Sequence, residues 1–179
     1  MSVRRTADAR GLVLEIHDLS RQAGTMRQLR RTAEAPQGVG LEVIEVPAGS
    51  PVELDVRLEA VGEGVLVTGT AMVRLAGECT RCLAEISTTS EVDIQELFHY
   101  PGHGPDGDEV SRVEGERIDL EPAIRDAVVL DLPFAPLCRD DCRGLCQRCG
   151  ANLNEEPDHQ HTDLVDSRWD GLSGWTPEG

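Results

Sequence analysis

The sequence predicts an α+β fold: mainly antiparallel β-sheet, with one or two short helices and a metal-stapled C-terminal segment. Three observations predict it. Residues 41–98 contain apolar runs and apolar–polar alternation, separated by turn residues, which is typical of half-buried strands. Residues 119–132 have helical spacing instead. The six cysteines of the 179-residue chain stand in short-range pairs, and paired cysteines are typical of metal sites.

The N-terminal region is predicted to be an arm followed by one strand and a turn. Residues 1–10 contain no apolar run, so we expect them to be flexible. Residues 11–16 are mostly apolar and read as a strand. Residues 17–24 end at a glycine, which favours a turn.

Three arginines follow closely, and their structural setting is open. Thr25 could cap a short helix running through Arg31, because a threonine oxygen accepts hydrogen bonds from the first backbone N–H groups of a helix. Such a helix would place Arg27, Arg30 and Arg31 at neighbouring surface positions. The alternative is a solvated basic loop.

The first two strands of the central region are marked by proline turns. Residues 41–46 form an apolar run that ends at Pro47, and residues 47–51 read as a turn. Residues 52–58 then alternate strictly between apolar and charged side chains. This period of two predicts a strand with one buried face.

A third strand is predicted after a glycine turn at residues 61–64, whose positive φ angles suit a hairpin. Its core-facing side would carry Val65, Val67, Gly69, Ala71, Val73 and Leu75. A glycine inside a strand often marks a bulge, so Gly69 is a candidate bulge. We expect these three strands to form an antiparallel meander.

One cysteine pair is predicted to lie at a hairpin tip. Cys79 and Cys82 come at the end of the third strand, and the β-branched residues 87–98 read as the returning strand. The glycine-rich and acidic residues 101–115 follow and are expected to be a mobile loop.

A helix is predicted next. Asp119 is a suitable cap, and Pro122 fits the first turn. The apolar positions then recur at helical spacing, as Ile124, Ala127 and Val128. The β-branched pair at 128–129 leaves a strand as the alternative. The helix would end at Pro133, where the chain passes directly to the cysteine cluster.

These patterns divide the chain into an α+β domain at residues 11–135 and a Cys/His metal-binding segment at residues 136–172. Residues 1–10 and 173–179 are expected to be flexible ends. Within the metal-binding segment, residues 168–172 contain apolar side chains and are expected to dock back on the domain.

Eight side chains are candidate metal ligands. The N-terminus carries no apolar signal region, and no run approaches the ~18 apolar residues of a membrane span. We therefore expect a cytoplasmic protein, with reduced thiols that serve as ligands rather than disulfides. The spacing suits structural Zn²⁺, one or two ions, held by tetrahedral sets of sulfur and nitrogen. The candidate ligands are Cys79, Cys82, Cys138, Cys142, Cys146, Cys149, His159 and His161.

The grouping of these ligands has two solutions. The favoured one combines Cys146 and Cys149 with the two histidines, and the hairpin pair with Cys138 and Cys142, because each set then needs only ordinary turns. The rival puts the four late cysteines on one ion and joins the hairpin pair to the histidines. His159 and His161 could also be an exposed polar tail. An iron–sulfur cluster is disfavoured because the spacing differs from that of ferredoxins.

The charge distribution points to possible partners. The net charge is -16, yet residues 1–31 hold seven arginines against three acidic residues, a local charge of +4. An acidic body suits a basic protein, whereas a basic arm allows a local RNA contact. The candidate contact residues are Arg27, Arg30, Arg31, Arg81, Arg143 and Arg148. Alternatively, the arginines beside the cysteines offset thiolate charge or pair with Asp140 and Asp141.

The sequence disfavours an enzyme. It lacks the His-x-Glu of zinc deaminases, a Gly-x-Ser-x-Gly motif, a phosphate loop and a dinucleotide fingerprint. A metal saturated by four protein ligands also has no open position for chemistry. We therefore expect no small-molecule substrate, no membrane partner and no catalytic residue. The alternative to a non-enzymatic factor is a zinc-dependent thiol redox sensor.

Four motifs carry a family resemblance: Gly-Glu-Cys-Thr-Arg-Cys-Leu at 77–83, Ile-Asp-Leu-Glu-Pro at 118–122, Leu-Pro-Phe-Ala-Pro-Leu-Cys at 132–138 and Gly-Leu-Cys-Gln-Arg-Cys-Gly at 144–150. Over roughly residues 11–172 the chain resembles the bacterial YceD family of large ribosomal RNA subunit accumulation proteins, in the form with an extended cysteine tail. The resemblance implies a non-enzymatic role in the synthesis, processing or stability of 23S rRNA and in ribosome assembly. The implied partners are large-subunit rRNA, a basic ribosomal protein, or both.

The resemblance also bears on the ligand grouping. Relatives with a reduced tail retain the hairpin pair and ligand-type residues near the positions of Cys138 and Cys142, which favours the first grouping. This chain carries His159 and His161 where some tailed relatives have a cysteine pair. The second set is therefore expected to mix thiolate and imidazole.

Overall fold

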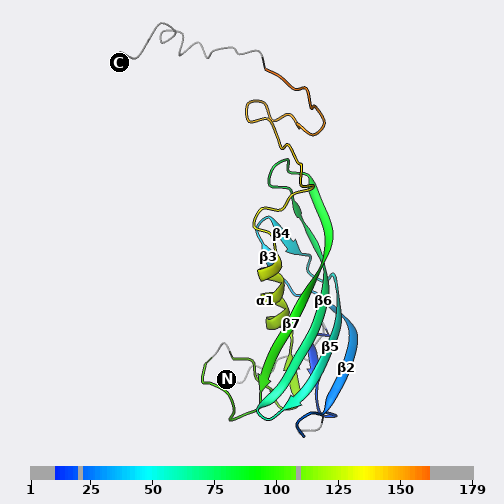
Figure 1. The fold of residues 1–179 in the computed structure, drawn as a ribbon, viewed down its shortest axis with the longest axis vertical. Coiled ribbons are helices and arrows are strands. Elements are labelled where there is room, and N and C mark those ends of the chain that lie inside the picture. The colour runs from blue at the N-terminus through cyan, green and yellow to red at the C-terminus, as the bar shows by residue number, and fades with distance from the viewer. Residues whose placement is uncertain (1–10, 20–21, 108–109, 162–179) are drawn as a thin grey trace, which may run out of the picture.

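The computed structural model describes residues 11–19, 22–107 and 110–161. These residues form a six-stranded antiparallel sheet, a separate two-stranded sheet and one helix (Figure 1). The predicted α+β class is confirmed. In chain order the elements are β1 (Val13–Glu15), β2 (Met26–Glu34), β3 (Val39–Leu41), β4 (Ile44–Val46), β5 (Pro51–Val61), β6 (Gly64–Glu78), β7 (Glu85–His99), β8 (Arg117–Asp119) and α1 (Glu121–Asp131).

Strand β6 is the central strand of the large sheet and pairs with β4, β5 and β7. Strand β7 pairs with it along its whole length on one edge. On the other edge, β5 pairs with residues 64–73 and β4 pairs farther along, with Ala76 and Gly77. The sheet then continues from β5 to β2 and from β4 to β3, while β1 and β8 form the small sheet. The β6–β7 hairpin consequently extends past most of the sheet (Figure 1).

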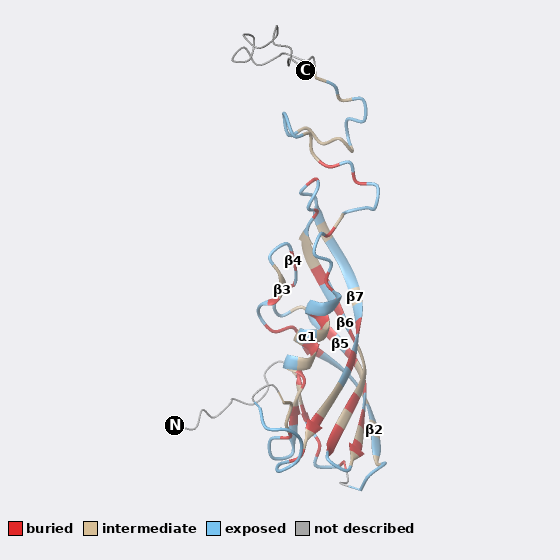
Figure 2. Cartoon of the chain, turned by 60° about the vertical axis from the view of Figure 1, so that its left-hand side comes forward, coloured by how far each residue is buried: buried red, intermediate tan, exposed pale blue. Residues whose placement is uncertain are grey.

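The core lies on one face of the large sheet. Strict alternation sends the apolar residues of β5 and β6 inward, where Val56, Leu58, Val65 and Val67 have no exposed surface. Helix α1 packs against β7 and β3 and buries Ile124 and other apolar residues in the same cluster. Figure 2 shows the buried residues alternating along the strands. The apolar positions of the alternating sequence pattern are therefore the residues that form the core.

Gly69 allows two strands to approach closely and does not form a bulge, so that expectation was wrong. It stands opposite Val56 on one side and Ile94 on the other, within uninterrupted registers. A Cβ placed at this position would lie 2.1 Å from the carbonyl oxygen of Asp55. The glycine is therefore required by backbone proximity rather than by an extra residue.

The helix or loop expected at residues 25–31 is instead strand β2. The strand pairs in register with β5 along its full length, and it turns Leu29 and buried Ala33 toward the core. Exposed polar residues hide this alternation in the sequence. Because side chains alternate along a strand, Arg27 and Arg31 share one face and Arg30 lies on the other.

The expectation of a single strand at residues 41–46 was also wrong. A turn at residues 42–43 divides it into the hairpin of β3 and β4. Gly40 makes this hairpin possible, since a Cβ there would lie 2.4 Å from the Cα of Glu45. Strand β4 pairs with β6 and not with β5, so the meander consists of β5, β6 and β7.

The helix agrees with most of its sequence signals. The N-cap residue is Leu120 and not Asp119, although Asp119 accepts a hydrogen bond from the backbone N–H of Glu121 (3.0 Å). Proline stands in the first turn, and the helix ends at Asp131, with Leu132 as its C-cap. Arg125 fastens it to the sheet side by donating to the carbonyl oxygens of Gly38 (2.5 Å) and Gln37 (3.1 Å). The chain therefore leaves the helix at a defined place, on its way to the cysteine cluster.

The predicted flexible ends at 1–10 and 173–179, and the predicted docking of residues 168–172, lie outside the described residues. The mobility expected for the loop at 101–115 stays a prediction. In the described part of the chain, no helix has both the length and the apolar character needed to cross a membrane.

Candidate metal centres

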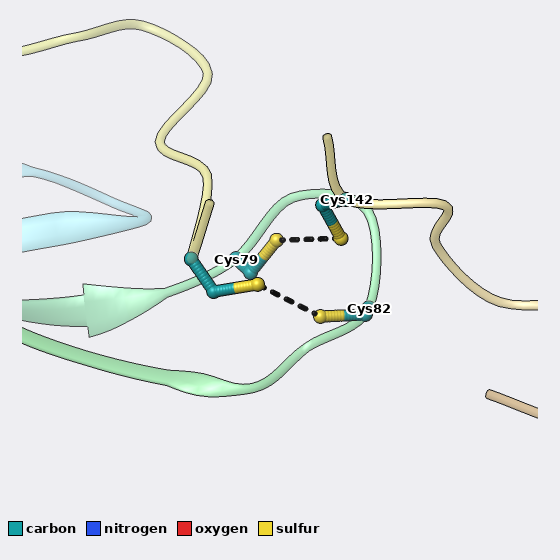
Figure 3. A group of neighbouring side chains, drawn as sticks. Cys79, Cys82 and Cys142 are labelled. Atoms are coloured by element: carbon teal, nitrogen blue, oxygen red, sulfur yellow. Dashed lines mark hydrogen bonds between the residues drawn. The ribbon is translucent and has the colours of Figure 1, made fainter. Parts of the chain in front are cut away.

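The loop joining β6 to β7 holds the first pair of cysteines at the tip of the hairpin. Its shape comes from backbone hydrogen bonds: the N–H of Cys79 donates to the carbonyl oxygen of Ala84 (2.8 Å), and the N–H of Leu83 donates to that of Cys79 (2.9 Å). Leu83 adopts φ 60°, the left-handed conformation that closes such a turn. The turn leaves Cys79 and Cys82 on the same side of the loop (Figure 3).

The hairpin tip also holds the tail by hydrogen bonds that involve no sulfur. Thr80 donates to the carbonyl oxygen of Pro136 through both its N–H (2.9 Å) and its hydroxyl (3.2 Å). Arg81 donates from its guanidinium to the carbonyl oxygen of Cys142 (2.9 Å). Its own carbonyl oxygen accepts from the N–H of Leu145 (3.0 Å). The segment after α1 is thereby brought to the two hairpin thiols.

Four thiols meet at this junction. Cys79 Sγ lies 3.8 Å from Cys142 Sγ, and Cys82 Sγ lies 3.6 Å from Cys138 Sγ. All four sulfurs lie within 4.8 Å of one another, and Figure 3 shows those of Cys79, Cys82 and Cys142 turned toward a common centre. Tetrahedral Zn²⁺ with Zn–S bonds of about 2.3 Å requires sulfurs about 3.8 Å apart. The set is therefore close enough to hold a metal ion, and its spacing suits zinc.

This first centre is largely buried. Cys79, Cys82 and Cys142 form a small cluster of their own, separate from the main core. Ile86, Leu137 and Leu145 pack against it, while Cys138 is exposed. An apolar wall around thiolates restricts access of water and competing ligands to a bound ion.

The thiols of the first centre titrate very differently. Burial raises the pKa of Cys79, but the backbone N–H groups of Cys138, Arg81 and Cys82 donate to its sulfur and together lower the pKa to about 6. The hydrogen bond with Cys82, burial and the other neighbouring thiols raise the pKa of Cys138 to about 12. Thiolates this close repel each other, so a cation is needed before all four can lose their protons near neutral pH.

A second group lies farther along the tail. Cys146 Sγ is 3.0 Å from His161 Nε2, Cys149 Sγ is 3.2 Å from His159 Nε2, and the two Nε2 atoms are 3.0 Å apart. A tetrahedral zinc site would place sulfur and nitrogen about 3.6 Å apart and the nitrogens about 3.4 Å apart. The group is thus close enough to hold a metal ion and would widen by a few tenths of an ångström around zinc.

A tight turn presents the two cysteines of the second group. The N–H of Gly150 donates to the carbonyl oxygen of Cys146 (2.8 Å), and the N–H of Cys146 donates to that of Ala151 (2.8 Å). Inside the turn, the N–H of Arg148 is the main donor to the Cys146 sulfur. Together with His161 and the N–H of Cys149, it lowers the pKa of Cys146 to about 6. The turn therefore favours the thiolate that a metal requires.

Glu156 orients one of the histidines. The Nδ1–H of His159 donates to Glu156 Oε2 (3.1 Å), and this leaves the Nε2 lone pair directed at Cys149 and His161. A carboxylate behind a ligating imidazole fixes both its tautomer and its ring position. Sequence reasoning missed Glu156, although a glutamate three residues before a candidate ligand is a usable signal.

The geometry corresponds to the first of the two ligand groupings. The four late cysteines do not form one set among the described residues, because Gly144 and Leu145 turn away to hydrogen-bond with the hairpin and with the second loop. Neither His99 nor His103 belongs to a group of potential ligands in the described part of the chain. Whether ions bind at the two groups stays a prediction.

The candidate contact arginines are mostly engaged within the chain. Arg27 forms an ion pair with Asp18 and donates to the carbonyl oxygen of Glu15 (2.7 Å). Arg30 pairs with Asp55 (2.8 Å). The remaining contacts are Arg31 with the carbonyl oxygen of Val13 (3.3 Å), Arg81 with that of Cys142 (2.9 Å) and Arg143 with that of Pro157 (3.1 Å). Arg148 is exposed and also interacts within the chain. The structure does not gather these six side chains into one basic patch, although Arg139 forms the expected kind of pair with Asp141 (3.2 Å).

The outer face of the large sheet carries more acidic than basic side chains. Cross-strand register places five acidic residues of β5 and β7 on it, namely Glu53, Asp55, Glu59, Glu91 and Asp93, together with three arginines, Arg30, Arg57 and Arg74. A hollow of about 450 Å³ lies on this face, and its lining includes Arg30 and Arg31 as well as Glu53, Asp55 and Glu91. Within the described part of the chain, Glu53, Glu91 and Asp93 form no ion pair. Arg30 and Arg57 are paired with Asp55 and Glu59, so the remaining carboxylates leave the face with a net negative charge that suits a positively charged partner.

Comparison with known proteins shows which family this sequence resembles. The sequence model described as Large ribosomal RNA subunit accumulation protein YceD matches residues 67–174. An uncharacterized protein of Mycobacterium tuberculosis is 46% identical over 162 residues, which cover 88% of this chain and 78% of the relative. One of Mycobacterium leprae is 40% identical over 166 residues, covering 90% of this chain and 76% of the relative.

A more distant relative carries a descriptive name. The chloroplastic large ribosomal RNA subunit accumulation protein YCED homolog 1 of Arabidopsis thaliana is 33% identical over 66 residues, covering 37% of this chain and 17% of that protein. No solved structure matches.

Proposed function

This chain belongs to the YceD family, and on that premise we propose that it acts in the cytoplasm in the accumulation of large-subunit rRNA. It would serve the synthesis, processing or stability of 23S rRNA and the assembly of the ribosome, and it would do so by binding rather than by catalysis. The family membership is the observation that carries this proposal.

We further propose that each of the two ligand groups holds one structural Zn²⁺. Each offers four sulfur or nitrogen donors, which is the full tetrahedral complement of zinc. An ion with four protein ligands has no free coordination position for substrate or water, so each ion would stabilise the fold and would not take part in a reaction. The first ion would fasten the tail to the β6–β7 hairpin, and the second would close the loop at residues 146–161.

The acidic outer face supports a basic ribosomal protein as the direct partner. Three of its carboxylates, those of Glu53, Glu91 and Asp93, are exposed and would repel the phosphates of RNA. Arg27 and Arg30, which could have bound phosphate, are already paired with aspartates. Large-subunit rRNA would then be reached through the bound protein.

A gene deletion tests the proposed function. Cells lacking this protein should show a reduced ratio of 23S to 16S rRNA, and the wild-type gene should restore it. The triple variant Glu53→Gln, Glu91→Gln and Asp93→Asn should restore it poorly. A control variant, Asp106→Asn with Glu116→Gln, removes two exposed acidic charges away from the large sheet and should complement fully. An unchanged rRNA ratio in the deletion strain would refute the function.

Co-purification separates the two kinds of partner. Large-subunit components should be retained at low salt and released at high salt, because exposed charges lose their attraction as salt screens them. If the partner is a basic protein, retention survives nuclease treatment. Loss of all bound material after nuclease would instead identify RNA as the direct partner.

One observation favours a second candidate function, a zinc-dependent thiol redox sensor. In the second group, exposed Cys149 stands beside Cys146, whose pKa is lowered to about 6, and accessible thiolates are the ones that oxidants attack. Mild oxidant should then release metal reversibly from the second group. Thiols that stay unmodified under such treatment would rule this function out.

A further inference from the structure

Asn154 belongs to one candidate metal loop and contacts the other. Along the chain it stands between the ligands Cys149 and His159 of the second group. Its side-chain Nδ2 nevertheless donates to Cys142 Sγ of the first group (3.5 Å). We propose that Asn154 is a positioning residue that couples metal binding at the two centres; this inference rests on the proposed metal binding.

The orientation of the Asn154 amide is determined by its neighbours. Its Oδ1 accepts from the backbone N–H of Arg143 (2.8 Å) and from the guanidinium of Arg139 (2.9 Å). Both are donors, so the oxygen must lie on their side and the NH₂ group must face the Cys142 sulfur. The same amide thus holds the segment that carries Cys142 and donates to the Cys142 thiolate.

The second loop in turn holds Asn154. Asn152 Oδ1 accepts from the backbone N–H of Asn154 (3.1 Å) and from its Nδ2 (2.9 Å). Asn152 forms an isolated bridge with Leu145, and the N–H of Leu153 donates to the carbonyl oxygen of Gly144 (3.0 Å). The position of Asn154 therefore depends on the folded shape of residues 144–154.

An ion at the second group would fix that shape. Cys146 and Cys149 begin the loop and His159 and His161 end it, so one ion would close it around Asn154. With the loop closed, Cys142 keeps an N–H···S hydrogen bond that stabilises its thiolate. With the loop open, Cys142 loses this donor and the segment after Cys138 loses the anchor at Arg139 and Arg143. A metal ion bound at the second centre should thus raise the affinity of the first centre for its own metal ion.

The coupling must act in both directions. Linkage requires that if one ion raises the affinity for the other by some factor, the reverse effect has the same factor. Couplings of this kind usually change affinity by about 5- to 150-fold. Each ion would then strengthen binding of the other, while each centre keeps its own four ligands and can still hold an ion when the other centre is lost.

Cobalt titration of the full chain tests this inference. Under anaerobic, reducing conditions, Co²⁺ bound by four thiolates absorbs differently from Co²⁺ bound by two thiolates and two imidazoles, so each centre can be followed separately. In the wild-type background, His161→Ala should weaken Co²⁺ binding at the all-thiolate centre by about 5-fold or more. In an Asn154→Ala background, the same His161→Ala change should leave that centre's affinity unaltered.

Two further variants keep the test specific. Asn154→Asp retains the acceptor oxygen but places a carboxylate beside the Cys142 thiolate, so it should weaken the all-thiolate centre more than Asn154→Ala does. Gln147→Ala alters an exposed side chain of the same loop and should change nothing. Far-UV circular dichroism checks that the sheet is folded in every variant.

The possible outcomes are distinct. If wild-type protein binds Co²⁺ at both centres but His161→Ala leaves the all-thiolate affinity unchanged, the coupling is refuted and the two metal sites stand. An effect of His161→Ala that persists in the Asn154→Ala background refutes the role of Asn154 alone. If wild-type protein binds no Co²⁺ at all, both the coupling and the proposed zinc sites fall.

Discussion

The sulfur atoms of Cys82 and Cys138 lie 3.6 Å apart, although 56 positions of sequence separate the two residues. One belongs to the tip of the β6–β7 hairpin and the other to the segment that leaves α1. No disulfide joins them, since both cysteines are free. Contact between such distant thiols is what an ion that joins the tail to the sheet would require.

Removal of metal should release the tail and leave the sheet intact. The main core contains none of the cysteines, whereas the buried cluster at the junction consists of three of them. In a chelator with reductant, limited proteolysis should cut rapidly within residues 139–161 while residues 22–99 stay protected. Equal protection of the tail with and without chelator would show that metal does not fasten it.

Gly144→Ala should loosen the junction between hairpin and tail. Gly144 has φ +77°, and a Cβ there would lie 3.0 Å from the carbonyl oxygen of Arg81, which must stay in place to accept from Leu145. We expect a loss of about 1–3 kcal/mol in the free energy of unfolding, measured by urea denaturation of the metal-loaded protein.

The matched control for this change is Gly102→Ala. Gly102 has a similar φ of +84°, but no atom lies within 4 Å of its Cβ position, so only the conformational cost remains. Equal losses for the two variants would mean that the contact with Arg81 has no energetic role.

The metal-free protein should become more stable as the pH rises from about 6 to about 9. The pKa values of Cys79 and Cys146 are lowered to about 6 from an ordinary value of 9.0. Between these limits the unfolded chain retains protons that the folded chain has lost, and stability then increases with pH. It is lost again as the pH falls through 6.

Above pH 9 the direction reverses. The pKa of Cys138 is raised to about 12, so the folded chain keeps a proton that the unfolded chain loses, and stability declines between about pH 9 and 12. Urea midpoints of chelated, reduced protein across this range measure both limbs. The double variant Cys79→Ser with Cys146→Ser should flatten the lower limb; a midpoint that rises equally in this variant would contradict the assignment.

Gly69→Ala should destabilise the sheet itself. Its Cβ would collide with the backbone of β5 at Asp55 and Val56, so the strands must separate at the centre of the core. Overpacking of this kind costs about 1–3 kcal/mol or more, and thermal unfolding of the metal-free protein measures it. Gly62→Ala, in the β5–β6 turn with no atom within 4 Å of its Cβ position, is the control. A melting temperature equal to that of the control would contradict the close approach.

Periodicity and spacing made much of this molecule predictable. Strands β5 and β6 follow from alternation because each has one buried and one exposed face. Strand β7 follows from its β-branched residues, and α1 follows from its apolar spacing and its proline. The lengths of the connecting turns and the family resemblance favoured one ligand grouping and left the rival open. These features depend on local sequence, which a single chain displays directly.

Other features were hidden because they depend on tertiary neighbours. Strand β2 is mostly exposed, so arginines mask its alternation, and only pairing with β5 makes it a strand. The turn between β3 and β4 lacks glycine and proline. The hydrogen bonds of Thr80 and Asn154 join segments far apart in the sequence, and no local pattern marks a side chain that donates across two loops.

The zinc content of protein purified without added metal, measured together with protein concentration, tests the central claim most directly. The wild-type chain should carry two Zn²⁺ per molecule, and Cys82→Ser and Cys146→Ser should each carry one, because each removes a ligand from a different centre. Wild-type protein that is folded and reduced but carries no zinc, or two variants that lose the same ion, would contradict the account.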